Sequence, residues 1–215
     1  AIVIGSGGHA RVLVDIAEKM NTIEIIGVLS NSTDERFLKY EILGDDLLLP
    51  ELYEQGIRHV IIGIGGFTDN IARKIIFNKI KSFGFSILNL IHPSVIIGSR
   101  VKLGTGVVLF AGVVLNPDVI IGDNVIIATG SSIDHETVIE DHCLISAGVT
   151  IGACVLIGSG TLCALGCKVV SQIEIGKNSL LAAGATVVNN LPLNSKAFGI
   201  PAKNRNYDSN NSENN

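Results

Sequence analysis

The sequence predicts a small Rossmann-like α/β domain followed by an all-β domain that is a parallel β-helix of hexapeptide repeats. An apolar or small residue returns every six positions over residues 91–186, and the residues before it alternate between short apolar strands and amphipathic helices. We therefore place the α/β domain at 1–84 and the β-helix at 85–203. The polar segment 204–215 has too few apolar residues to fold, and we expect it to be disordered.

The repeat of six is typical of a parallel β-helix, in which each repeat is a short strand plus a turn. Three strands make one triangular coil, so residues eighteen apart stack at the inter-strand spacing of about 4.8 Å. A second series, four places after the first, fills the inner corners and holds small or β-branched residues. Glycines such as Gly98 and Gly158 follow first-series residues, where we expect unusual backbone angles. The first series is Ile91, Ile97, Leu103, Leu109, Leu115, Ile121, Ile127, Ile133, Ile139, Ile145, Ile151, Ile157, Cys163, Val169, Ile175 and Leu181.

Composition limits the classes of function. Hydrophobic residues make up 47% of the chain and the mean hydropathy is +0.47, but no run of about eighteen apolar residues is uninterrupted, so we expect no membrane span. The net charge of −4 is spread over mixed acids and bases, which argues against nucleic acid as a partner. The four cysteines fit core packing in a reducing compartment, and no leader segment is evident, so we expect a cytoplasmic protein.

The first domain reads as strands at 1–4, 23–29 and 60–64 with helices between and after them, the last at 69–83. Strands that alternate with helices predict a parallel, doubly wound sheet. The turn that begins at Gly5 has the spacing Gly-x-Gly-x-x-Ala between the first strand and the first helix. Glycine there lets a phosphate approach the amides at the helix N-terminus.

A complete dinucleotide site also has an acidic residue at the end of the second strand, and Ser30 and Asn31 stand there instead. The pattern therefore favours a nucleoside-diphosphate pocket, and a tight turn without any ligand is the alternative. His9 on the same turn is a candidate hydrogen-bond donor to the substrate, or else a helix cap.

The ionisable cluster of the β-helix is centred on His135, flanked by Asp134 and Glu136. A carboxylate on one ring nitrogen fixes the tautomer and raises the basicity of the other, as a general base for acyl transfer requires. Ala153 lies eighteen residues further on, where its small side chain leaves room for a thioester and its backbone N–H is expected to face the oxyanion. We expect no cysteine beside His135 in this register, which favours direct transfer without an acyl-enzyme.

Several motifs together resemble bacterial sugar acetyltransferases of the NeuD/PglD type, in the hexapeptide-repeat acyltransferase superfamily. They are the turn 5–9, Asn116-Pro117, the segments 127–131 and 133–136, the segments 175–178 and 183–188, and the segment 199–203. The resemblance implies a left-handed β-helix and a homotrimer with active sites between neighbouring subunits. It also implies acetyl-CoA as co-substrate, no metal, and a sugar substrate that is held by the first domain.

The resemblance also assigns roles to individual residues. His135 matches the catalytic base and Glu136 the acid that tunes it. The positions that line the coenzyme groove are Ala153, Leu165 and Ala183, and those that contact the substrate are Gly7, Gly8, His9, Ser30, Asn31 and Gly65. Leu144 stands where the family often has a second histidine, and Ser30 and Asn31 stand where binders of uridine diphosphate sugars have acids.

The function we expect is N-acetylation of a nucleotide-linked amino sugar in the synthesis of a surface polysaccharide or glycoprotein precursor. O-acetylation of sialic acid or a related sugar uses the same base and remains an alternative. A trimeric zinc hydrolase would need three converging histidines, and His135 and His142 are those at hand. A non-catalytic trimeric scaffold is the remaining alternative. The sugar, the nucleotide, the pathway and the role of His142 are left open.

Overall fold

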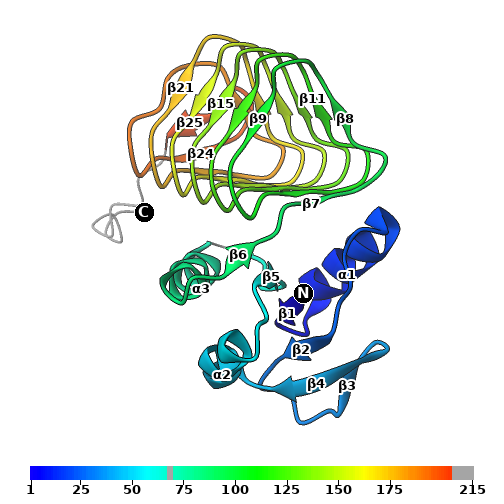
Figure 1. Cartoon of the computed structure of the whole chain (residues 1–215). Coiled ribbons are helices and arrows are strands. Elements are labelled where there is room, and N and C mark those ends of the chain that lie inside the picture. Colours follow the sequence, from blue (N-terminus) through cyan, green and yellow to red (C-terminus); the bar gives the residue numbers. More distant parts are fainter. Residues whose placement is uncertain (67–69, 205–215) are drawn as a thin grey trace, which may run out of the picture.

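The structure, a computed structural model, describes residues 1–66 and 70–204. Its first part is an α/β domain and its second part a β-helix whose coils stack into one prism (Figure 1). Both predicted classes of fold are confirmed. The last eleven residues of the predicted tail, and Asp69 at the start of the predicted helix 69–83, lie outside the described residues.

The α/β domain is built on a sheet with the strand order β3-β4-β2-β1-β5-β6. The pairs are parallel except for β3 with β4, so the predicted parallel sheet is confirmed, while β3 and β4 were not predicted. The elements are β1 (Ile2–Ile4), α1 (Gly8–Met20), β2 (Gly27–Leu29), β3 (Arg36–Phe37), β4 (Tyr40–Gly44), the 3-10 helix η1 (Asp46–Leu48), α2 (Leu49–Glu54), β5 (His59–Ile62), α3 (Ile71–Ser82) and β6 (Ser86–Ile87).

The β-helix has three faces, and along most of each face parallel two-residue strands pair eighteen residues apart. The last pairs of one face differ: Leu180 pairs with Lys196, and Ala197 pairs with Asn204 in antiparallel orientation. The β7 sheet contains β7 (Leu90–Ile91), β10 (Val108–Leu109), β13 (Ile126–Ile127), β16 (Leu144–Ile145), β19 (Leu162–Cys163), β22 (Leu180–Leu181), β24 (Lys196–Phe198) and β25 (Lys203–Asn204). The β8 sheet contains β8 (Ile96–Ile97), β11 (Val114–Leu115), β14 (Ser132–Ile133), β17 (Thr150–Ile151), β20 (Lys168–Val169) and β23 (Thr186–Val187). The β9 sheet contains β9 (Lys102–Leu103), β12 (Ile120–Ile121), β15 (Val138–Ile139), β18 (Leu156–Ile157) and β21 (Glu174–Ile175). The winding is that of a left-handed β-helix, as the resemblance implied.

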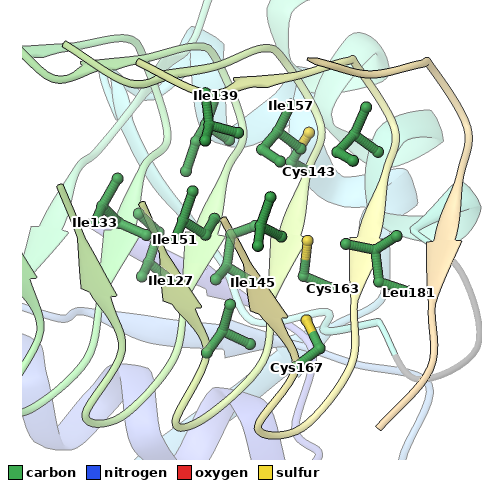
Figure 2. Close-up of a cluster of buried hydrophobic side chains, with 14 of the residues drawn as sticks. Ile127, Ile133, Ile139, Cys143, Ile145, Ile151, Ile157, Cys163, Cys167 and Leu181 are labelled. Atoms are coloured by element: carbon green, nitrogen blue, oxygen red, sulfur yellow. The ribbon is translucent and has the colours of Figure 1, made fainter. Parts of the chain in front are cut away.

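The interior is filled as the hexad pattern predicts. From Leu109 onward the first series is almost fully buried, and Figure 2 shows its isoleucines pointing into the prism beside Cys143 and Cys163. Ile97 is an exception, with 42% of its surface exposed, because it belongs to the first coil and has no coil on its outer side. The buried hydroxyls of the second series are satisfied by carbonyls: Thr137 Oγ1, for example, donates to Gly152 O at 2.8 Å.

The glycines after first-series residues serve a different purpose from the one expected. Gly98 and Gly158 are absent from the described residues with positive φ. A Cβ on Gly98 would lie 2.6 Å from the backbone nitrogen of Pro117, and one on Gly158 would lie 2.6 Å from that of Lys177. Their role is to let the next coil approach closely, so the prediction of unusual backbone angles there was wrong.

The α/β domain covers the outer face of the β7 sheet. Outward-facing side chains of that sheet, such as Val108 and Leu144, share one buried cluster with Leu13 and Ile16 of α1. Leu144, at the family's second-histidine position, is 7% exposed and belongs to this domain contact. Figure 1 shows α1 and α3 on the β7 side of the prism.

Polar contacts fix α3 on the β-helix. The fully buried guanidinium of Arg73 donates to Ile62 O at 2.6 Å, to Ile64 O at 2.9 Å and to Gly106 O at 3.3 Å. His142 O accepts a hydrogen bond from Asn70 Nδ2 at 2.8 Å, and the His142 ring lies edge-on to Phe77. His142 therefore joins the two domains. Within residues 1–66 and 70–204, every helix is too short or too polar to span a bilayer.

Candidate active site

His135 and Glu136 lie in the turn between β14 and β15, at the corner where the β8 sheet meets the β9 sheet. His135 Nδ1 is 3.0 Å from Glu136 Oε2, and both side chains are exposed. The Asp134 carboxylate accepts hydrogen bonds from Asn116 Nδ2 at 2.7 Å and from the backbone amide of His135 at 2.8 Å. The bond from Asn116, followed by that from the amide, lowers the pKa of Asp134. With its proton on Nδ1, the ring presents Nε2 as a base.

Cys154 lies directly above Glu136 on the next coil. Cys154 N donates to His135 O at 3.0 Å, and Cys154 Sγ is 3.8 Å from Glu136 Oε2. Glu136 and Cys154 both have left-handed backbone conformations, with φ of 57° and 56°. The expectation that no cysteine stands beside His135 was therefore wrong, because the position eighteen after Glu136 holds one.

Cys154 is not poised as a nucleophile. Desolvation, and then the Glu136 carboxylate, raise the pKa of its thiol, which disfavours the thiolate. The donor atoms of His135, Glu136 and Cys154 lie within 4.8 Å of one another, and in the described part of the chain this is the group that could hold a metal ion. A base that is oriented by a carboxylate needs no metal to accept a proton.

Ala153 neighbours this corner, as predicted, but its amide is not free. Ala153 N donates to Ser171 Oγ at 3.0 Å, and the residue is 8% exposed. The prediction of an amide that faces an oxyanion was therefore wrong.

The glycine turn after β1 is open to a ligand. Gly7 is the N-cap of α1, and no side chain caps the helix there. A Cβ on Gly7 or on Gly8 would meet no heavy atom within 4 Å, so packing does not require glycine at either position. The amides of the first turn therefore form a site where a phosphate fits.

His9 follows this turn and packs against the β-helix. Its ring stacks on Phe110 with centroids 5.7 Å apart, and a Cβ on Gly65 would lie 3.0 Å from the Cβ of His9. Burial, and then the charge of Arg73, lower the pKa of His9 to about 3, so the imidazole is neutral near pH 7. In the described part of the chain, the buried His9 Nε2 has no hydrogen-bond partner. His9 does not cap the helix, because no side chain makes a capping hydrogen bond at the N-terminus of α1.

A pocket of about 210 Å³ opens at the carboxyl ends of β1 and β2. It contains the predicted Ser30 and Asn31, and Ser30 Oγ lies 2.6 Å from Ser6 Oγ. It also contains Asp46, a carboxylate that sequence reasoning missed, whose Oδ2 accepts from Lys79 Nζ at 2.6 Å. Recognition of β4 as a strand would have revealed Asp46, because the ends of parallel strands meet at one edge. Two larger cavities, of about 610 Å³ and 530 Å³, contain none of the predicted site residues.

One chain does not bring all the predicted site residues together. Phe110, which His9 contacts, follows β10 at the corner between the β7 and β8 sheets. The exposed residues Leu165 and Ala183 lie in later turns of the same corner, with Gly184 N donating to Leu165 O. His135 and Ala153 lie at the corner between the β8 and β9 sheets, across the prism from the face that the α/β domain covers.

Comparisons with known proteins give a consistent assignment. The family model of the PglD N-terminal domain matches residues 1–80. A histidine-to-asparagine variant of perosamine N-acetyltransferase from Caulobacter crescentus, solved with CoA and GDP-perosamine, is 33% identical with a TM-score of 0.90, covering 95% of this chain and 96% of that one. The acetyltransferase domain of PglB from Neisseria gonorrhoeae, solved with acetyl coenzyme A, is 27% identical with a TM-score of 0.88, covering 95% and 98%.

A more distant structure, WeeI from Acinetobacter baumannii, is 17% identical with a TM-score of 0.68, covers 95% of this chain and 98% of that one, and supports the fold alone. A search of curated proteins found no match. The identity and coverage of the Caulobacter enzyme, together with the matched domain and the hexapeptide coils, determine the family. The chain belongs to the hexapeptide-repeat sugar acetyltransferases of the NeuD/PglD type, and it is an acetyltransferase that uses acetyl-CoA.

Proposed function

We propose that the protein transfers an acetyl group from acetyl-CoA to the amino group of a nucleotide-linked amino sugar. The observation that carries this proposal is the hydrogen bond of 3.0 Å between His135 Nδ1 and Glu136 Oε2 on the exposed corner. It is supported by the 33% identity to an enzyme that was solved with CoA and GDP-perosamine. That sugar nucleotide carries an amine, which favours N-acetylation over O-acetylation.

In the proposed mechanism His135 Nε2 accepts a proton from the sugar amine while the nitrogen attacks the thioester carbonyl. The tetrahedral intermediate then collapses with cleavage of the carbon–sulfur bond. The imidazolium returns the proton to the departing coenzyme thiolate, and Glu136 stabilises the imidazolium in between. Transfer is direct, because the raised pKa of Cys154 makes this neighbouring thiol a poor nucleophile at neutral pH.

The proposed site lies between neighbouring copies in a homotrimer. Its support is the separation of the two halves of the site on one chain, at different corners of the prism. One copy supplies His135, Glu136 and Ala153. Its neighbour supplies the coenzyme-lining Leu165 and Ala183, together with the substrate-binding residues Gly7, Gly8, His9, Ser30, Asn31 and Gly65.

The experiment follows coenzyme A thiol release with GDP-linked and UDP-linked amino sugars and with free sialic acid. His135→Asn is expected to lower kcat by about 10²- to 10⁴-fold with little change in KM. Glu136→Gln is expected to lower kcat less than His135→Asn does, because the ring keeps a hydrogen-bond partner at Nδ1. His59→Asn, an exposed histidine at the start of β5, is the matched control and keeps full activity. Full activity of His135→Asn would overturn the mechanism, and release with sialic acid alone would move the reaction to O-acetylation.

A further inference from the structure

We propose that the pocket beside Ser30 binds the base of the nucleotide, and that Asp46 with Lys79 makes it selective for guanine. This inference rests on the proposed function and adds the identity of the nucleotide. It starts from a carboxylate in a position that neither the sequence pattern nor the resemblance assigns. Asp46 reaches the pocket from η1, next to the end of β2, where Ser30 and Asn31 replace the usual acid.

The shape and lining of the pocket suit a flat heterocycle. Its volume of about 210 Å³ has room for one ring system, and less than ligand pockets that enclose a whole drug-sized molecule. Aliphatic and polar side chains both line it, from several elements. The aliphatic side chains, four of the eight lining residues, offer apolar surface to the face of a base, while Ser30, Asn31 and Asp46 offer polar groups to its edge. The aliphatic side chains are Ile4, Leu29, Ile64 and Ile76.

The rest of the ligand has a defined direction. Gly5 lines the pocket and also begins the glycine turn, so the pocket adjoins the N-terminus of α1. A base in the pocket places the diphosphate over the exposed amides of Gly7 and Gly8, where the helix dipole attracts negative charge. The sugar then extends past His9 toward the corner with Phe110, which is the side of the β-helix that the proposed trimer places against a neighbour.

The charged pair selects the base by its hydrogen-bonding edge: Asp46 lines the pocket, and Lys79, which is not a lining residue, contacts Asp46. Asp46 Oδ2 accepts from Lys79 Nζ at 2.6 Å, and in the described part of the chain Asp46 Oδ1 has no partner. The side chains of Asp46 and Lys79 are 36% and 34% exposed, so both charges are partly shielded from water. A carboxylate accepts two parallel N–H groups, and the ammonium has donors to spare.

Guanine matches this pair on three adjacent atoms. Its N1–H and N2–H groups donate to a carboxylate, and its O6 accepts from an ammonium. Uracil presents a single N–H between two carbonyls, one of which would face the carboxylate. Adenine presents an unprotonated nitrogen at the position where guanine has N1–H. The structure at 33% identity that contains GDP-perosamine agrees with this preference.

The test measures binding of GDP, IDP, UDP, ADP and 2′-deoxy-GDP to the full chain by calorimetry. GDP is expected to bind at least tenfold more tightly than UDP or ADP, and more tightly than IDP, which lacks the N2 amino group. Asp46→Asn is expected to remove the preference for GDP over IDP, because the carboxamide keeps one acceptor. Asp45→Asn is the matched control: its carboxylate accepts from Leu47 N in the same turn and lies outside the pocket lining, so it should leave the preference unchanged.

Three outcomes would overturn the inference. If GDP and UDP bind equally tightly and Asp46→Asn changes neither affinity, the pocket does not select the base. The proposed transferase reaction would be unaffected by that result. If the wild type binds 2′-deoxy-GDP more weakly than GDP by the same factor as Asp46→Asn weakens the binding of GDP, the carboxylate contacts the ribose and not the base. If no nucleoside diphosphate binds although acetyl-CoA does, the nucleotide-linked substrate of the proposed function fails as well.

Discussion

His9 makes the stability of the protein sensitive to mild acid. Its pKa is lowered from 6.5 to about 3 by burial and then by the charge of Arg73. Because the folded state disfavours the proton, the stability is fully present above pH 6.5 and is lost as the pH falls toward 3. Linkage with these two values gives a loss of about 2 kcal/mol between pH 7 and pH 5, and an upper limit near 5 kcal/mol at pH 3.

His9→Gln removes the titrating group and keeps a polar side chain against Phe110. The free energy of unfolding is measured with urea at pH 7 and at pH 5, at one protein concentration, for both proteins. The variant is expected to lose about 2 kcal/mol less than the wild type between the two pH values, whatever its stability at pH 7. Other titrating groups contribute equally to the change in both proteins, so their effect cancels in the difference. These groups include His142, whose pKa is also lowered by burial. Equal losses in the two proteins would refute the argument that His9 is buried and neutral.

Three further predictions concern chemistry and packing. Cys154→Ala should keep kcat within a few-fold in the thiol-release assay, because the proposed transfer is direct and uses no thiol of the protein. A loss as large as that of His135→Asn would indicate an acyl-enzyme. Arg73→Met should lower the free energy of unfolding by more than about 3 kcal/mol, since the carbonyls of Ile62, Ile64 and Gly106 lose their donor; a smaller loss in urea unfolding would mean that water replaces the guanidinium. Ile139→Ala should lower the free energy of unfolding by about 2–5 kcal/mol and Ile97→Ala by under about 1 kcal/mol in the same urea assay, because Ile139 is fully buried and Ile97 is 42% exposed. Similar losses for the two variants would contradict the exposure of the first coil.

The β-helix could be predicted from sequence because its contacts repeat. Each coil places residue i over residue i+18, so a local pattern determines long-range pairs such as Val108 with Ile126. The same arithmetic gives the neighbour of Glu136, which is Cys154. The register from His135 leads to Ala153 and that from Glu136 leads to Cys154, so the sequence contains the signal for this neighbour.

Other features have no local signal. The strand β4 (Tyr40–Gly44) is largely half-exposed and lacks a clear apolar alternation. The sequence therefore did not indicate that Asp46 follows a strand and lies at the edge of the sheet. The amide of Ala153 finds Ser171 Oγ through a side-chain hydroxyl that the hexad pattern does not constrain. The role of His142 depends on α3 packing against the β-helix, and that contact joins residues 72 apart in the chain.

The placement of the glycine turn and of His135 at different corners has a genetic consequence under the shared-site proposal. A chain that lacks His135 still carries an intact turn, and a chain with a damaged turn still carries His135. When the two kinds of subunit assemble together, some interfaces join the intact turn of one to the intact histidine of the other. Two alleles that are each inactive alone would then complement each other in one cell.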